Sequence, residues 1–311
     1  MSRLLRRDEW TSFERAVLVE LDTDTGRART VLEYTSPRDA CPDEDPSILF
    51  KSASWDGDEL LLCTQTEVLF VDPAQGVVRR TLSLPWFNDV HHVARIDGRL
   101  HVVSTGLDLV LVLDDDGRVL EEHTATGESP WLRFDRATDY RKIHTTKPHR
   151  AHPNYVFAVD GRRWTTRFEQ HDALCLDDGS TTEVLADAPI HDGVLDAEGL
   201  WFTAVNGRVM QVEPTTGRLL ARHDLNRHQP DGTPLGWCRG IRREPDRVLV
   251  GFSRLRPSLF AQNLSWLRPA LKRPEPLPCR VTAYDRDFGR VQASWDLEPA
   301  GMSAIFSILP A

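Results

Sequence analysis

Short runs of β-forming residues separated by glycine-containing turns repeat along the whole chain, and this repeat constrains the fold more than any other feature. One set of turns carries Asp-Gly or a related pair between two apolar runs: 56–57, 97–98, 160–161, 198–199 and 245–246. A second, longer set ends in Gly: 22–26, 72–76, 114–117, 177–179, 213–217 and 285–289. Asp-Gly between apolar runs is typical of β-hairpins. Two hairpins per repeat predict a unit of four antiparallel strands.

The first strands of the units can be overlaid through one small residue in each. These residues are Ala53, Ala94, Ala151, Gly193, Gly240 and Ala304, with spacings of 41, 57, 42, 47 and 64 residues. The shorter spacings match the roughly 40–50 residues of a propeller blade. We therefore expect an all-β fold, a six-bladed β-propeller forming a single domain over residues 1–311. Two stacked β-sandwiches, the rival architecture, would not explain the common register.

The two longer spacings contain insertions, near 126–147 and 254–279. Residues 126–147 lead into the strand of His149, so we expect a binding loop at the channel mouth. Within 257–273 apolar residues recur at a helical spacing, which predicts a surface helix or a homodimer contact. In the closing blade, 16–34 would supply outer strands and 302–309 the inner strand. No segment is evident for the second strand of that blade.

Residues two positions before each small residue are expected to project into the channel, since positions i and i+2 of a strand share a direction. These residues are Lys51, His92, His149, His191, Cys238 and Met302. Three of them, His92, His149 and His191, predict a site for one divalent transition metal, Zn²⁺, Fe²⁺ or Cu²⁺. If the overlay slips by one residue, His91 replaces His92. A metal-free polar site and purely structural histidines are the alternatives.

Further polar residues near these positions complete the predicted site. Some would orient the imidazoles, whereas Cys238 would be a soft ligand, a thiolate activated by Arg239, or a small buried hydrophobe. Arginines at a channel mouth would bind a carboxylate, phosphate or sulfate, or else join blades by salt bridges. The predicted catalytic residues are Asp89, His91, His152, Asp192 and Cys238. The predicted substrate-binding residues are Lys51, Tyr140, Arg150, Arg167 and Arg239.

Charge and composition narrow the functional classes. The 311 residues include 38 Lys and Arg against 47 Asp and Glu, a net charge of −9, so no basic face for nucleic acid is expected. No apolar run approaches the about 18 residues of a membrane helix, and the N-terminus lacks the apolar core of a signal peptide. Five cysteines without a C-x-x-C pair argue against a disulfide framework. We therefore expect a cytoplasmic protein that binds neither nucleic acid nor membrane.

Several segments between about Leu60 and Pro310 carry a resemblance to known proteins. They are 89–100, 103–105, 236–241, 250–256 and 305–310. The chain looks like a member of an uncharacterised family of bacterial six-bladed β-propellers, known as conserved hypothetical proteins, which implies the fold but no reaction. The family pattern His-x-Asn-Gly is replaced here by His149-Arg150-Ala151-His152.

Three other propeller families are more distantly similar. The runs Ala151-His152-Pro153 and His191-Asp192 resemble carotenoid cleavage oxygenases, whose iron is held by four histidines. The His91-His92 run and Thr165-Thr166-Arg167 are similar to arylsulfotransferases, which use a histidine without metal. Size and blade count resemble the senescence-marker-protein and gluconolactonase family. Its carboxylate and Asn metal ligands have no counterparts in the ring.

Three functions therefore remain open. The first is a metal-dependent enzyme, a hydrolase, lyase, isomerase or non-haem oxygenase, acting on a small polar or anionic molecule. The second is a metal-free enzyme with a channel histidine as nucleophile or general base, sulfotransferase-like or lyase-like. The third is a protein-binding scaffold. The small residues leave the channel open, which favours an enzyme.

Overall fold

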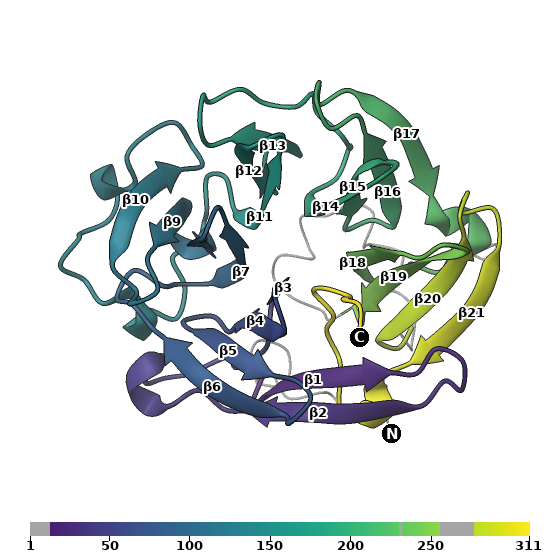
Figure 1. The fold of residues 1–311 in the computed structure, drawn as a ribbon, viewed down its shortest axis with the longest axis horizontal. Helices are drawn as coiled ribbons and strands as arrows, with labels where there is room; N and C mark the ends of the chain where they lie inside the picture. Colours follow the sequence, from purple (N-terminus) through teal and green to yellow (C-terminus); the bar gives the residue numbers. More distant parts are fainter. Residues whose placement is uncertain (1–12, 230–231, 256–276) are drawn as a thin grey trace.

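The computed structural model describes residues 13–229, 232–255 and 277–311. In that part of the chain, five antiparallel sheets follow one another around a central axis (Figure 1). The first sheet contains β3 (Ala53–Asp56), β4 (Glu59–Cys63), β5 (Val68–Asp72) and β6 (Val77–Leu82). The second contains β7 (Val90–Ile96), β8 (Arg99–Ser104), β9 (Leu109–Leu113) and β10 (Val119–Thr124).

The remaining three sheets continue the same order. The third contains β11 (Pro153–Val159), β12 (Arg162–Arg167) and β13 (Asp172–Cys175). The fourth contains β14 (Ile190–Asp196), β15 (Gly199–Ala204), β16 (Arg208–Val212) and β17 (Leu219–Asp224). The fifth contains β18 (Trp237–Arg243), β19 (Arg247–Ser253), β20 (Arg280–Asp285) and β21 (Val291–Asp296). The first strand of each sheet lies nearest the axis (Figure 1), which is the arrangement of a β-propeller.

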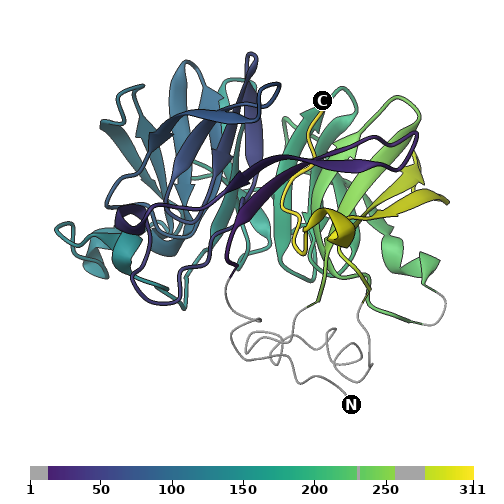
Figure 2. The same cartoon turned by 90° about the horizontal axis from the view of Figure 1, so that it is seen from below.

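The prediction of six blades is wrong, because the described residues form five. The sector between β6 and β21 holds only a two-stranded sheet of β1 (Ala16–Leu21) and β2 (Ala28–Tyr34). Residues 302–309, expected as an inner strand, run near the axis without joining a strand ladder. We call this sector, with β1, β2 and residues 302–311, the closing sector. In Figure 2 the β1–β2 hairpin crosses obliquely in front of the C-terminal segment.

The closing sector is held to its neighbours mainly by serine hydroxyls. Ser253 Oγ accepts from the Ile305 amide at 2.9 Å and donates to the Ile305 carbonyl at 3.0 Å. On the other side, the Ala53 amide donates to Ser307 Oγ at 3.1 Å, and Ser52 Oγ donates to the Phe306 carbonyl at 3.3 Å. These bonds replace a strand ladder, so the ring closes through side chains.

The turn pattern of the sequence is confirmed as hairpins. Asp97 and Gly98 have φ of 48° and 71°, and Asp160 and Gly161 have φ of 49° and 74°. Two successive positive φ values are required by a type I′ turn, which Asp-Gly adopts at little steric cost. Each pair joins the first and second strands of its blade, β7 to β8 and β11 to β12.

The middle strands are apolar on both faces because each blade packs between two others. All five residues of β9, Leu-Val-Leu-Val-Leu, are buried, and Leu100 and Leu111 have no measurable exposure. Outer strands instead alternate, as in β6, where exposed and half-buried side chains follow one another. The packed faces between blades therefore form the core.

Helical structure is limited to short 3₁₀ turns in the described residues. They are η2 (Arg38–Ala40), η3 (Thr105–Leu107), η4 (Pro130–Leu132), η5 (Tyr140–Lys142), η6 (Leu225–His228) and η10 (Glu298–Ala300). None of the described helices has the length and apolar character needed to cross a membrane. Residues 257–273, where a helix or a dimer contact was predicted, lie outside the described residues. Of the surrounding insertion, only 254–255 and 277–279 are described.

Candidate functional site

Six side chains from successive sectors gather near the axis, and we call them the channel ring. They are Lys51, His91, His152, His191, Arg239 and Phe306. The ring centroid of His91 lies 4.9 Å from that of His152 and 6.4 Å from that of His191. The Arg239 guanidinium lies 4.6 Å, and Lys51 Nζ 5.2 Å, from the centre of the Phe306 ring. The closing sector thus contributes one aromatic side chain to a set of cations and imidazoles.

The histidine of β7 that faces the ring is His91, and the prediction of His92 is wrong. The His92 ring stacks on Tyr155 at 3.7 Å, and its Nδ1 accepts from the Val156 amide at 3.1 Å. His92 therefore fills the interface between two blades. A β-bulge between Val90 and His92 inserts one extra residue, which reverses the alternation assumed in the overlay.

Two other predicted ring positions, Cys238 and Met302, also lie outside the ring. Cys238 is fully buried in the core cluster beside β18, and burial raises the pKa of its thiol well above the ordinary value. A thiol in that state is neither a thiolate nor a channel group, and Arg239 takes its place. β18 also carries a bulge, between Cys238 and Ile241. Met302 packs beside the apolar cluster of Leu297 rather than in the ring.

His149 belongs to a pair with His152. Their Nδ1 atoms lie 2.9 Å apart, so one of the two nitrogens carries a proton and donates it to the other. His149 Nε2 lies 3.3 Å from the hydroxyl of Thr146. Through this pair the end of the 126–147 insertion reaches the ring.

The predicted metal ligands are not brought together as a set. His92 faces Tyr155, whereas His149 contacts His152. Across the described ranges, no group of three or more His, Cys, Asp or Glu side chains is arranged to hold a metal ion. Metal binding therefore stays a prediction, although the three histidines from which it was inferred do not form one ligand set.

Asp108 positions the His149–His152 loop, although the sequence analysis did not single it out. Its carboxylate accepts from the amides of Arg150, Ala151 and His152 at 2.8 to 2.9 Å, and from Arg133. The side chain is buried and its backbone has φ of 53°. A buried carboxylate that satisfies three consecutive amides fixes the loop.

His91 is held in one tautomer by its neighbours. Its Nδ1 lies 2.7 Å from the carbonyl oxygen of Asp89, which can only accept, so Nδ1 carries the proton. Nε2 therefore carries the lone pair of the ring, which accepts from Lys51 Nζ at 3.3 Å. Lys51 Nζ also donates to Asp89 Oδ1 at 2.7 Å. The predicted residues Lys51, Asp89 and His91 thus form one hydrogen-bonded unit.

Burial sets the protonation of the ring. It lowers the pKa of His91, His152 and His191 well below the ordinary value, so all three are neutral at pH 7. It also lowers the pKa of Lys51, and that of Arg239 to about 10. Burial alone would raise the pKa of Asp89, yet the charge of Lys51 holds it well below its usual range. The ring with Asp89 therefore carries two cations and one carboxylate.

Two ring groups have polar atoms that the described structure leaves unsatisfied. His191 Nε2 and Arg239 Nε are buried without a hydrogen-bond partner among the described residues. Among those residues Arg239 also forms no salt bridge. The free guanidinium beside Lys51 is the feature that an anion would satisfy.

Asp192 supports the ring from behind rather than facing it. Its carboxylate accepts from Thr203 Oγ1 and from the Gly240 amide at 3.0 Å, and burial raises its pKa to about 6. Gly240 has φ of 76°, and a Cβ there would come within 3.0 Å of the Ser307 backbone. Asp192 thus ties β14 to β18 beside the C-terminal segment.

Three predicted substrate-binding residues lie elsewhere. Arg150 pairs with Glu128 at the surface, and Arg167 pairs with Asp172 and donates to the Ala125 carbonyl. Tyr140 is buried in the core cluster of the second blade. Both arginines therefore form salt bridges within the structure, which was the alternative to anion binding in the sequence analysis.

Phe306 and Phe168 were also missed by the sequence analysis. Phe168 lies 4.6 Å from His152 and 5.5 Å from His191, as measured between ring centroids. The sequence did contain an indication that Phe306 faces the channel. It follows the small residue Ala304 by two positions and so shares its face of an extended segment. Phe168 and Asp108 follow strand ends, where the repeat gives no register.

Three solved structures are similar to this chain in fold. A protein of unknown function from Bacteroides caccae is 13% identical, with a TM-score of 0.59 over 94% of this chain and 93% of that one. The WD40 β-propeller domain of Doa1 is 13% identical, with a TM-score of 0.53 over 94% and 78%. Streptogramin B lyase is 14% identical, with a TM-score of 0.50 over 90% and 76%.

These likenesses establish the β-propeller fold and nothing further, because the identities are low. No protein-family model matches the chain, and no curated protein matches it.

Proposed function

We propose that the protein is an enzyme that transfers a proton on a small anionic molecule bound at the channel ring. One observation carries the proposal: the His91 Nε2 lone pair is fixed beside a buried ammonium, close to a guanidinium without a salt bridge among the described residues. A neutral imidazole next to anion-binding groups is suited to general base catalysis. A metal-dependent reaction would need ligands other than the set of His92, His149 and His191.

Arg239 would hold the anionic group of the substrate. Its guanidinium lies over Phe306, which fixes its plane, and it offers paired N–H donors to a carboxylate, sulfate or phosphate. With the anion there, a neighbouring C–H would lie toward His91 and Lys51.

The proposed step is an elimination or isomerisation. Once the substrate displaces Lys51 Nζ from His91 Nε2, this nitrogen takes the proton of the substrate C–H bond, and the electron pair of that bond forms a carbon–carbon double bond or an enolate. In an elimination, the leaving group departs with the bond pair and takes a proton from the Lys51 ammonium. Lys51 regains a proton from water, and His91 releases its proton to water. Asp89 keeps Lys51 in place.

The test is exchange of substrate hydrogen for deuterium in D₂O, followed by NMR over a panel of small carboxylates, sulfate esters and phosphate esters. We expect exchange with at least one member and a loss of about 10²-fold or more in His91→Gln. His223→Gln, on β17 far from the ring, is the matched control and should not change the rate.

Arg239→Lys separates binding from chemistry. Because Lys cannot form a paired contact, we expect KM to rise at least tenfold with a smaller change in kcat. No exchange with any compound, or exchange that survives His91→Gln, would contradict the enzyme.

The pH dependence is a further prediction. Because burial lowers the pKa of His91 well below 6.5, the base stays unprotonated as the pH falls from 8 to 6. We expect kcat/KM to be flat over that range, with its acid limb below the ordinary histidine pKa. A midpoint near 6.5 would show that a solvated histidine, not His91, is the base.

A second candidate is a module that binds the anion without chemistry. It is favoured by the pairing of Lys51 with Asp89, whereas Arg239, the other cation of the ring, has no salt bridge among the described residues. Binding of a panel member that depends on Arg239, with no exchange at any pH, would support this candidate.

A further inference from the structure

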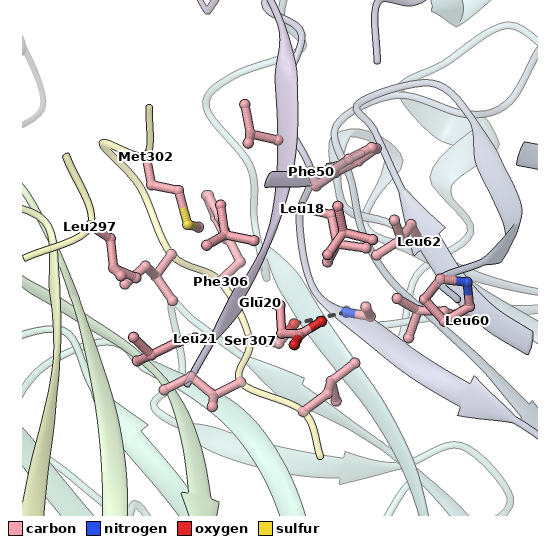
Figure 3. Close-up of a pocket in the computed structure, with 18 of the residues that line it drawn as sticks. Leu18, Glu20, Leu21, Phe50, Leu60, Leu62, Leu297, Met302, Phe306 and Ser307 are labelled. Atoms are coloured by element: carbon pink, nitrogen blue, oxygen red, sulfur yellow. Dashed lines mark hydrogen bonds between the residues drawn. The ribbon is translucent and has the colours of Figure 1, made fainter. Parts of the chain in front are cut away.

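A cavity of about 860 Å³ borders the closing sector, and two members of the channel ring, Lys51 and Phe306, are among the residues that line it. Figure 3 shows Leu18, Phe50, Leu60 and Leu62 on one side of it and Leu297 and Met302 on the other. This volume lies in the upper part of the range of about 300–1,000 Å³ typical of ligand pockets. The walls are mostly apolar, so water alone gains little there.

Two uninterrupted stretches of backbone border the cavity. Every residue of 15–21 lines it, and so does every residue of 301–311. Side chains of a strand alternate between its faces, so a stretch in which every residue borders a space presents its edge to that space. Strand β1 pairs only with β2, and its other edge is open toward the cavity.

The C-terminal stretch also has unused main-chain groups. Among the described residues, the amides of Phe306, Ile308 and Leu309 find no hydrogen-bond partner. The serine hydroxyls described above hold this stretch instead. Both borders of the cavity are therefore strand edges that lack a ladder.

The cavity occupies the place of one missing strand. The four-stranded blades run from an inner to an outer strand through four positions. In the closing sector the C-terminal segment lies at the inner position, and β1 and β2 lie at the outer two (Figure 1). No strand of the described residues occupies the second position, for which the sequence offers no evident segment.

We propose that this gap accepts an extended peptide strand from a partner protein, with apolar side chains facing both neighbouring blades. Only a peptide offers main-chain donors and acceptors to both edges at once, as in strand addition. A lipid or small apolar molecule would fill the volume and leave both edges unpaired. Residues 1–12 of this chain include Arg3, Arg6, Arg7, Asp8 and Glu9. Five charges in twelve residues make that segment unsuited to an apolar slot.

The test uses a synthetic peptide that copies β9, Leu-Val-Leu-Val-Leu, with Lys at each end for solubility. The sequence is known to suit a position buried on both faces. We expect the fluorescently labelled peptide to bind the full-length protein saturably. The same peptide with alternate amides N-methylated keeps every side chain and loses the ladder donors, and we expect it to bind at least tenfold more weakly.

Two substitutions locate the site. Leu18→Lys places a charge inside the gap and should weaken binding at least tenfold. Leu120→Lys, on β10 at an exposed position across the molecule, should not change binding. Hydrogen exchange should slow in 16–21 and 305–309 when the unmodified peptide binds.

Two outcomes would overturn the proposal. Equal binding of both peptides would make the gap a pocket for apolar molecules rather than a strand acceptor. Absence of binding up to millimolar peptide would also overturn it, and slow exchange of the β1 amides in the free protein would then indicate that the chain fills the gap itself. The N-methylated control needs no substitution, so the test holds even if Leu18→Lys fails to fold.

Discussion

The second blade and the closing sector are built by opposite means. In the second blade, four strands share ladders, and β9 is buried along its whole length. In the closing sector, two strands and one irregular segment border a cavity, and serine hydroxyls join the irregular segment to the first and fifth blades. Both sectors nevertheless place a side chain in the channel ring, His91 and Phe306. Whether a sector contributes a side chain to the channel ring therefore depends on the path of its innermost backbone segment, not on the number of strands in the sector.

The difference shows which property each region supplies. The packed blades hold the buried histidines and the carboxylates that position them, and these groups need fixed geometry. The closing sector supplies an apolar ring and a gap. Rigidity and stability are thus concentrated in the blades, while the closing sector is the region able to change.

Acidification should produce the largest effect, because the blades carry the buried histidines. Burial lowers the pKa of His91, His152 and His191, and that of His92 to about 3. The unfolded state then binds more protons below about pH 6.5, so the stabilisation present at neutral pH is lost as the pH falls toward the folded values.

As the pH falls by one unit in this range, each of these four histidines lowers the free energy of unfolding by about 1.4 kcal/mol. Asp192, whose pKa burial raises to about 6, opposes them with one contribution of similar size. We expect the free energy of unfolding to fall between pH 6 and pH 5, measured by urea unfolding, because the histidines with a lowered pKa outnumber the carboxyl that opposes them. His191→Phe should reduce this slope by about one histidine's contribution. An unchanged slope would show that His191 is not buried in the neutral form.

Matched leucine truncations compare the two regions directly. Leu111→Ala in β9 removes a fully buried side chain and should cost about 3 to 4 kcal/mol. Leu18→Ala in β1 borders an existing cavity and should cost about 1 kcal/mol, because little packing is lost there. Denaturant unfolding measures both. Equal costs would mean that the gap is filled in solution.

Loss of the Ser253 hydroxyl should have the smallest effect on stability. Ser253→Ala removes the hydroxyl that both accepts from and donates to Ile305, leaving two main-chain groups unpaired, at a cost of about 1 to 2 kcal/mol. Hydrogen exchange should accelerate in 302–309 and stay unchanged in β9. Ser129→Ala, at an exposed position where the side chain caps no amide, is the control and should change stability by no more than about 0.5 kcal/mol. Acceleration throughout the molecule would mean that the closing sector unfolds with the blades.

The strand order of the blades was predictable because Asp-Gly turns and apolar runs are local features. The channel ring was predictable only in part. Lys51 and His191 lie where they were expected, whereas His91 and Arg239 are neighbours of the predicted residues, and His152 and Phe306 lie three and four positions further along than predicted. His91, Asp89, Lys51, His152, His191 and Arg239 were all among the candidates, yet the bulges in β7 and β18 shifted which side chains face the axis. A bulge depends on pairing with the neighbouring strand, which the order of residues along one strand does not reveal.

The blade count failed for a related reason. The overlay treated the small residue Ala304 as evidence of a strand, whereas that segment only needs room to pass the neighbouring blade. Gly251 provides such room, since a Cβ there would lie 2.7 Å from Ile305. Small residues therefore mark close approach of two backbones, with or without a ladder between them.

The serine bonds of the closing sector also have a consequence for biosynthesis. Ser52 and Phe306 are separated by 254 positions, and the hydroxyl of one meets the carbonyl of the other. Phe306 is translated only after all five blades, because it follows β21 in the sequence. A nascent chain that stops before Ile305 has all five blades in its sequence and still lacks one wall of the channel ring. Assembly of the complete ring would thus report that synthesis has passed this point.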